Sequence, residues 1–246
     1  MPFSMRLDGK AALVTGGAMR LGRVVALELA HAGANVAITY RTSAQQAAST
    51  VAELEALGVR ALAVECDVRS ETSVAAAVGH MVGHFGQLDV VVNNAAVFET
   101  AELATLTIEA WDRAFETNTR GPFLVAREAR AALQATRGRI VNIGSLGGLR
   151  PWATHAHYCA SKAALHALTE SMARAFAPEI GVNCVAPGFI DFAEDRGALA
   201  ERLAARTPLG RLGQAEEIAA AVLFFAAGPA YVTGQVLAVD GGLGLV

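Results

Sequence analysis

The chain has 246 residues, of which 53% are hydrophobic and 17% charged, with a formal net charge of −3. This composition excludes an intrinsically disordered chain, and the lack of a basic block argues against an electrostatic nucleic-acid binder. No apolar run reaches the roughly 18 to 20 residues of a membrane span, so we expect one soluble α/β domain over residues 1–246 with no membrane partner.

Short apolar or β-branched runs alternate with longer runs rich in Ala, Leu and Glu. The predicted strands are residues 11–15, 35–40, 60–66, 88–93, 139–143, 181–186 and 235–239. The predicted helices are residues 21–32, 43–57, 71–85, a long helical region at 107–136 with Gly121 and Pro122 inside it, 158–177 and 215–227. This alternation with short connections predicts a doubly wound parallel sheet covered by helices on both faces.

Residues 188–208 form the least regular stretch and follow a predicted strand. A substrate lid and an ordinary surface loop with a short helix fit this composition equally well.

The three cysteines, Cys66, Cys159 and Cys184, lack CxxC spacing, so neither a disulfide framework nor a zinc site is predicted. His155 and His157 have no acidic partner at metal-ligand spacing, and we expect no metal. The first ten residues contain neither an apolar segment nor a twin arginine, which makes a cytoplasmic location the default expectation.

A glycine-rich turn from Thr15 to Gly22 joins the first predicted strand to the first predicted helix. Glycines such as Gly16 let a pyrophosphate approach the backbone, and the helix N-terminus supplies amide donors. The pattern is not GxGxxG, and many such turns only pack a helix on a sheet. Its place in the first βα unit nevertheless favours a dinucleotide site.

The residues at the end of the second predicted strand indicate whether the site suits NAD or NADP. An NAD site usually has an acidic residue there, whereas this chain has Tyr40, Arg41, Thr42 and Ser43. Because a guanidinium suits a 2′-phosphate, we predict NADP(H) as the cofactor. The alternative is that Arg41 is a solvated residue before a helix capped by Ser43.

Tyr158 and Lys162 stand four residues apart and share one face of a predicted helix. A nearby cation favours the phenolate, as proton transfer to or from an alkoxide requires. Ser145 follows a predicted strand, where its hydroxyl can hold a carbonyl oxygen beside the phenol. The alternatives are a pair on a helix surface and a serine that caps a turn.

With these motifs, the chain resembles the short-chain dehydrogenases/reductases from about Asp8 to Gly242. The motifs that carry the resemblance are the turn at Thr15–Gly22, Asp67-Val68, Asn93-Asn94-Ala95-Ala96, Asn118, Ser145, Tyr158 with Lys162, Pro187-Gly188 and Val239-Asp240-Gly241-Gly242. The resemblance implies a Rossmann fold, hydride transfer with a nicotinamide cofactor, and a homotetramer or homodimer.

The resemblance also implies individual roles. Tyr158 would be the general acid, Lys162 would lower its pKa and bind the nicotinamide ribose, and Ser145 would orient the carbonyl. Asn118 would hold the water of a proton relay. Asp67 and Val68 would contact the adenine, Asn94 the ribose beside it and Ile190 the nicotinamide carboxamide. The implied cofactor-binding residues are Gly16, Arg20, Leu21, Arg41, Thr42, Asp67, Val68, Asn94, Ala95, Tyr158, Lys162, Pro187, Gly188 and Ile190.

Two residues depart from the usual pattern of the family: Arg20 replaces a glycine, and Phe192 stands where many members have threonine. Arg20 and Phe98 resemble the arginine and phenylalanine with which pteridine reductases hold the pterin. Ser145 instead resembles ketone reducers such as the 3-oxoacyl-carrier-protein reductases. Core packing is the alternative for Phe98. The residues expected to contact substrate are Phe98, Trp152, Phe189 and Phe192.

The main hypothesis is an NADP(H)-dependent reductase that converts a small-molecule ketone, with a 3-oxoacyl group as one candidate, to a secondary alcohol. A pteridine reductase, which adds hydride to a C=N bond, is the first alternative. A non-catalytic regulatory protein that binds NADPH is an alternative of another class. The four filled catalytic positions argue against it.

Overall fold

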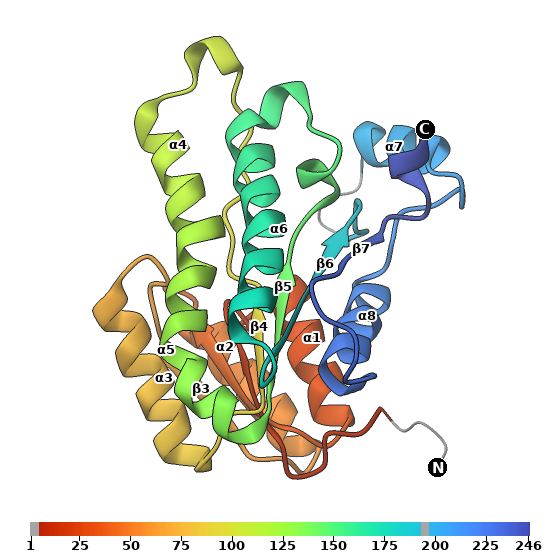
Figure 1. The fold of residues 1–246 in the computed structure, drawn as a ribbon. Coiled ribbons are helices and arrows are strands. Elements are labelled where there is room, and N and C mark those ends of the chain that lie inside the picture. Colours follow the sequence, from red (N-terminus) through yellow and green to blue (C-terminus); the bar gives the residue numbers. More distant parts are fainter. Residues whose placement is uncertain (1–4, 193–196) are drawn as a thin grey trace.

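In the described residues, 5–192 and 197–246, the computed structural model contains a sheet of seven parallel strands in the order β3-β2-β1-β4-β5-β6-β7 (Figure 1). The strands are β1 (Ala11–Val14), β2 (Asn35–Tyr40), β3 (Ala61–Glu65), β4 (Val90–Asn93), β5 (Arg139–Ile143), β6 (Gly181–Pro187) and β7 (Val236–Val239). The strand order reverses between β1 and β4. In open α/β sheets, ligands bind at the carboxyl ends of the strands beside such a switch point.

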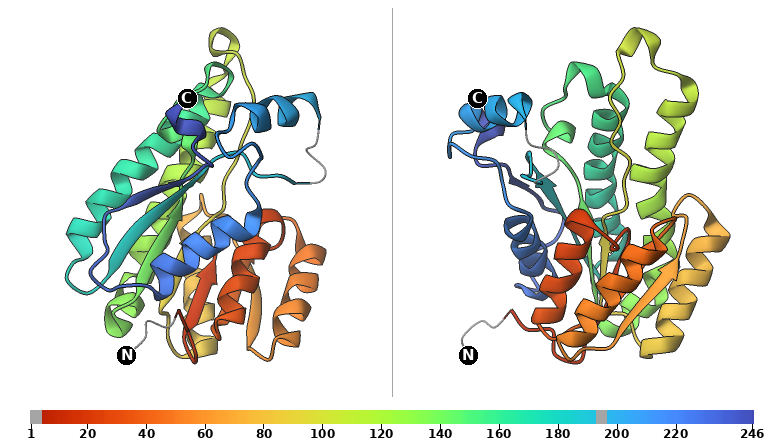
Figure 2. Two further views of the ribbon diagram at one scale, coloured as in Figure 1. Left: turned by 90° about the vertical axis from the view of Figure 1, so that its right-hand side faces the viewer. Right: turned by 180° about the vertical axis from the view of Figure 1, so that it is seen from behind.

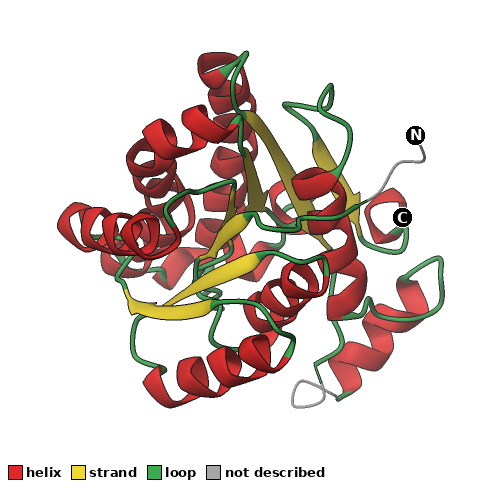
Figure 3. Ribbon diagram, turned by 90° about the horizontal axis from the view of Figure 1, so that it is seen from below, coloured by secondary structure: helices red, strands yellow, loops and turns green. Residues whose placement is uncertain are grey.

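Helices cover both faces of this sheet, as the view along it in Figure 3 shows. The helices are α1 (Arg20–His31), α2 (Ala44–Ala56), α3 (Glu71–Phe85), α4 (Ile108–Phe115), α5 (Gly121–Thr136), α6 (Ala156–Phe176), α7 (Ala198–Arg206) and α8 (Ala215–Ala227). Helix α8 packs beside α1 (Figure 2). Because both faces are covered, β1, β4 and β6 are buried along their whole length. The predicted fold class is therefore confirmed.

Two hydrophobic cores lie on the two faces. The first joins the sheet to α1, α2 and α8 and includes Leu29 and Val222. The second joins the sheet to α3, α5 and α6 and includes Met81 and Leu133. Among residues 5–192 and 197–246, no helix is both long and apolar enough to cross a bilayer.

The predicted helical region at residues 107–136 is confirmed, since residues 108–136 are helical without a break. It consists of α4, a π-helical turn over Glu116–Arg120, and α5. Pro122 has no N–H to donate to the preceding turn, and the π-helical turn lies directly before it.

The stretch at residues 188–208, where a substrate lid and a surface loop with a short helix were both expected alternatives, contains helix α7, and its residues 193–196 lie outside the described part of the chain. Beyond α7, the amide of Leu209 donates to the carbonyl of Gly241, which ties this stretch to the C-terminal segment.

Candidate active site

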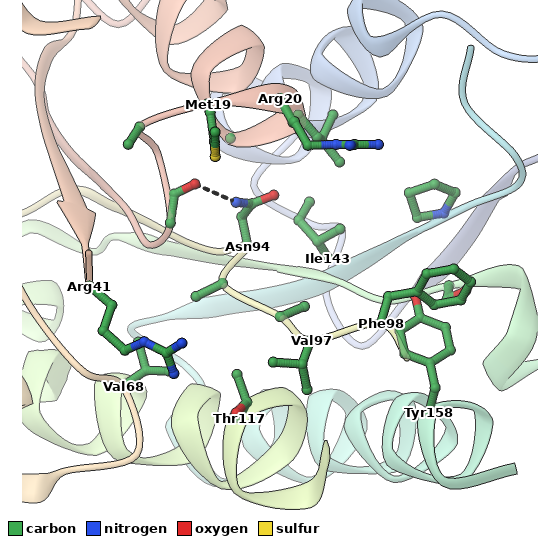
Figure 4. Close-up of a pocket in the computed structure, with 18 of the residues that line it drawn as sticks. Met19, Arg20, Arg41, Val68, Asn94, Val97, Phe98, Thr117, Ile143 and Tyr158 are labelled. Carbon is green, nitrogen blue, oxygen red and sulfur yellow. Dashed lines mark hydrogen bonds between the residues drawn. The ribbon is translucent and has the colours of Figure 1, made fainter. Parts of the chain in front are cut away.

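A cleft of about 560 Å³ opens along the carboxyl ends of the strands (Figure 4). Arg41 and Val68 lie at one end of it, and Phe98 and Tyr158 lie at the other. All the predicted cofactor-binding and substrate-contacting residues line this cleft, as does Ser145. Of the predicted residues, Asn118 alone does not. The volume is in the range typical of small-molecule sites.

The glycine turn brings the N-terminus of α1 to the cleft. The N-cap residue Met19 makes no side-chain capping bond, and the first turn of α1 contains no acidic residue. Gly16 adopts φ +63°, and a Cβ atom at Gly22 would lie 2.2 Å from the carbonyl oxygen of Gly16. Such a tight turn at a positive helix end fits a pyrophosphate.

Arg20 is the non-glycine residue of this turn in the left-handed region, with φ +49°. This conformation explains why a glycine suits the position. The guanidinium carbon of Arg20 lies 4.3 Å from the centroid of the Phe192 ring. The two departures from the family pattern thus contact each other, and both line the cleft.

A hydrogen-bond network fixes the floor of the cleft. The Thr15 hydroxyl accepts from the amides of Asn94 and Ala95, both at 3.0 Å. The side-chain amide of Asn94 donates to the carbonyls of Thr15 and Gly16 at 2.9 and 3.1 Å (Figure 4). Asn94 therefore holds the glycine turn in place. Its contact with a ribose stays a prediction.

The Arg41 end carries paired charges. Asp67 accepts a bidentate ion pair from Arg69, with 2.6 Å between Nη2 and Oδ2. The Arg69 guanidinium is the main cause that lowers the pKa of Asp67 to about 2, and the charge of Arg41 contributes. Arg69 thereby orients the carboxylate that was expected to face the adenine, a role that sequence inspection missed.

At the other end, Tyr158 and Lys162 project from the first turns of α6, and Ser145 follows β5. The buried Lys162 ammonium donates to the carbonyl of Ile143 at 2.6 Å and lies 5.9 Å from the Tyr158 ring centroid. Burial lowers the pKa of Lys162 to about 8. The resemblance to the family gave no signal for the part played by the Ile143 carbonyl.

Burial raises the pKa of Tyr158 to about 12, and an interaction with the Ser145 hydroxyl opposes part of this rise. The net direction is opposite to the lowering expected from Lys162, because desolvation of the phenolate dominates. A phenol that stays protonated at neutral pH suits a proton donor better than a proton acceptor.

Asn118 lies in the π-helical turn and is fully buried. Its side chain accepts from the Val97 amide and donates to the Val97 carbonyl and the Ser161 hydroxyl, all at about 3.0 Å. These bonds fix the segment after β4 against α6. The water-holding role stays a prediction.

His166 supports the loop of the catalytic serine from behind. Its Nε2 accepts from the backbone amide of Ser145 at 3.4 Å. Burial and the charge of Lys162 lower the pKa of His166 to about 4, so the ring is a neutral acceptor near neutral pH. Because His166 stands four residues after Lys162, the sequence could have indicated that the two side chains lie on one face of α6.

Aromatic rings surround Tyr158. Phe98 lies 4.8 Å from it, and Trp152 lies 6.4 Å from it, measured between ring centroids. The Phe98 side chain is 55% exposed, so its alternative assignment to the core is wrong. Within the described ranges, no group of three or more His, Cys, Asp or Glu side chains could hold a metal ion.

The comparisons with known proteins agree with this geometry. A family model described as enoyl-(acyl carrier protein) reductase matches residues 16–244. The chain belongs to the short-chain dehydrogenase/reductase family of oxidoreductases.

Two curated relatives and one solved structure illustrate the range of this similarity. The 3-oxoacyl-[acyl-carrier-protein] reductase of Pseudomonas aeruginosa is 42% identical, over 97% of this chain and 99% of that protein. The L-rhamnose 1-dehydrogenase (NAD(P)(+)) of a Sphingomonas species is 38% identical, over 96% and 97%. A short-chain dehydrogenase from Burkholderia cenocepacia, solved in complex with NADP, is 40% identical over 97% and 99%, with a TM-score of 0.92. The predicted family and enzyme class are thus confirmed.

Proposed function

We propose that the chain is an NADP(H)-dependent reductase that converts a ketone to a secondary alcohol. The observation that carries the proposal is the convergence of Ser145, Tyr158 and Lys162 on the cleft that also contains Arg41. The NADP complex of the Burkholderia relative supports the choice of dinucleotide. The 3-oxoacyl reductase among the relatives makes a 3-oxoacyl group one candidate substrate.

The residues of the cleft fit a dinucleotide along its length. The α1 N-terminus and the turn at Gly16 suit the pyrophosphate, and Arg41 suits the 2′-phosphate, because no acidic residue ends β2. Asp67 and Val68 suit the adenine, and Lys162 and Ile190 suit the nicotinamide end. When bound, the cofactor supplies the hydride, and the protein provides orientation and the proton.

The side chains at the Tyr158 end perform the proton chemistry. The Ser145 hydroxyl orients the carbonyl oxygen beside the phenol, and Tyr158 Oη donates its proton to that oxygen as negative charge develops there. The Lys162 charge stabilises the phenolate that remains. Protonation of Tyr158 at neutral pH supports this direction of transfer.

The test is NADPH oxidation with an acetoacetyl thioester and, separately, with a dihydropterin. We expect turnover of the thioester. The Tyr158→Phe variant should bind NADPH by fluorescence titration yet react at least ~10²-fold more slowly. Unchanged turnover in that variant would exclude Tyr158 from the mechanism.

Activity with the dihydropterin alone would instead support a pteridine reductase. The positions of Arg20 and Phe98 on the cleft favour this second candidate. NADPH binding with no turnover of either compound class would favour a regulatory protein.

The proposal also includes a segment that covers the substrate and a homo-oligomer of the chain. The described residues that follow β6 would cover the substrate, since Phe189, Ile190 and Phe192 already line the cleft. A homotetramer or homodimer would cover exposed apolar side chains on α4 and α5, such as Ile108 and Phe123. Light scattering measures that assembly, and a monomer would refute it.

A cytoplasmic location completes the proposal, and cell fractionation tests it.

A further inference from the structure

The aromatic rings beside Tyr158 form a connected wall. Phe98 and Tyr158 are nearly perpendicular, at 79°, and their centroids are 4.8 Å apart (Figure 4). Trp152 is almost parallel to Tyr158, at 15°, and its centroid lies 5.0 Å from that of Phe189. Phe98, Trp152 and Phe189, called the aromatic wall below, thus adjoin the group that donates the proton.

The position of Phe98 within this wall is fixed from behind. The His155 ring stacks on it, with 4.6 Å between centroids and 13° between planes. Both nitrogens of His155 are satisfied, since Nε2 pairs with the Thr100 hydroxyl at 3.1 Å and Nδ1 with the Thr154 hydroxyl at 3.0 Å. Burial lowers the pKa of His155, so its ring is neutral at neutral pH. A preorganised ring loses little conformational freedom when a ligand binds.

Phe98 nevertheless remains 55% exposed within the cleft. A flat apolar ring that covers it would remove this surface from water and gain an aromatic contact. The fixed orientation of the wall favours a rigid planar group over a flexible chain, which would lose rotamer freedom on binding.

Charges are sparse at this end of the cleft. Among the charged residues that line the cleft, Arg41 lies at the opposite end, and Asp67 is paired with Arg69. The Arg20 guanidinium lies over the Phe192 ring, which is outside the aromatic wall. The Lys162 ammonium is buried against the Ile143 carbonyl. A polyhydroxylated substrate would place its hydroxyl groups against hydrocarbon, which costs hydrogen bonds.

We propose that the chain takes aryl ketones, in which an aromatic ring is attached to the carbonyl carbon, and that the aromatic wall is the subsite for that ring. This inference rests on the proposed carbonyl reduction at Ser145 and Tyr158. The carbonyl carbon gains a hydride from NADPH, the C=O π bond breaks, and the oxygen gains the Tyr158 proton. The ketone is reduced to a secondary alcohol, and NADPH is oxidised to NADP⁺.

The experiment compares kcat/KM for 1-phenylethanone with that for 2-octanone, a flexible ketone of equal carbon number, by NADPH absorbance. We expect the aryl ketone to be preferred by about tenfold. Phe98→Leu should remove most of this preference. Phe123→Leu on α5 is the matched control, because Phe123 is 41% exposed and outside the cleft, and it should leave the preference intact.

Trp152→Leu provides a second test of the wall, and circular dichroism verifies that each variant is folded. Equal kcat/KM values for the two ketones, or a preference that survives both wall variants, would overturn the inference. Turnover of 2-octanone or an acetoacetyl thioester without turnover of the aryl ketone would overturn it too, while the proposed reductase function would stand. NADPH binding without reduction of any ketone would remove the proposed function itself.

Discussion

The Lys162 ammonium donates a hydrogen bond to the carbonyl of Ile143, with 2.6 Å between Nζ and O. Ile143 is the last residue of β5, and Ser145 follows it closely, so this bond ties α6 to the loop of the catalytic serine. The same ammonium lies 5.9 Å from the centroid of the Tyr158 ring. Lys162 is therefore both an anchor for the loop and a positive charge beside the phenol.

We expect kcat/KM for carbonyl reduction to fall as the pH rises through about 8. This quantity reports groups of the free enzyme, and Lys162, with a pKa of about 8, loses its charge there. Tyr158, with a pKa of about 12, stays protonated. In the Lys162→Met variant, kcat/KM should be low and independent of pH over this range. A flat wild-type profile from about pH 7 to pH 10 would show that the lysine charge is not needed.

Arg41→Ala should weaken NADPH binding by about 10- to 100-fold and NADH binding much less, because one charge-assisted contact to the 2′-phosphate is lost. Fluorescence titration of both dinucleotides measures this. Arg69→Ala is the matched control, since Arg69 pairs with Asp67 at the same end of the cleft. That variant should weaken both dinucleotides by the same factor. Equal losses for Arg41→Ala would refute the phosphate role.

The parallel sheet, the helices on its two faces and most of the residues that line the cleft could be predicted from the sequence, because they follow from local patterns. A buried run such as Val90–Asn93 and a glycine turn each specify their own geometry. Since parallel strands carry their carboxyl ends to one edge, residues as distant as Arg41 and Ile190 were expected on one cleft.

What could not be predicted depends on contacts between segments distant in sequence. The side chain of Asn118 bonds to Val97 and Ser161, and no local pattern indicates these partners. The orientation of the Phe98 ring depends on its stacking against His155. The pKa of Tyr158 was expected to fall because spacing identifies a nearby cation, whereas spacing carries no information about desolvation.

Replacement of Arg20 should show the cost of its left-handed backbone. Arg20→Gly and Arg20→Ala both remove the guanidinium, but only the alanine keeps a Cβ at φ +49°. We expect the glycine variant to be more stable by about 1 kcal/mol in urea unfolding. The same pair at Arg137, where φ is +53°, is the control and should give a similar difference. An alanine variant as stable as the glycine variant at Arg20 would mean that the turn relaxes.

His166 should make folding stability depend on pH. Its pKa is about 4 in the folded chain and near 6.5 in the unfolded chain, so between these values the unfolded chain binds the extra proton. The free energy of unfolding should therefore fall as the pH drops below about 6.5, with a contribution from His166 of about 2 kcal/mol between pH 7 and pH 5. His166→Leu should reduce the fall by that amount in urea unfolding, whereas His80→Leu, at an exposed position on α3, should leave it unchanged. If wild type and His166→Leu lose equal stability, His166 is protonated alike in both states.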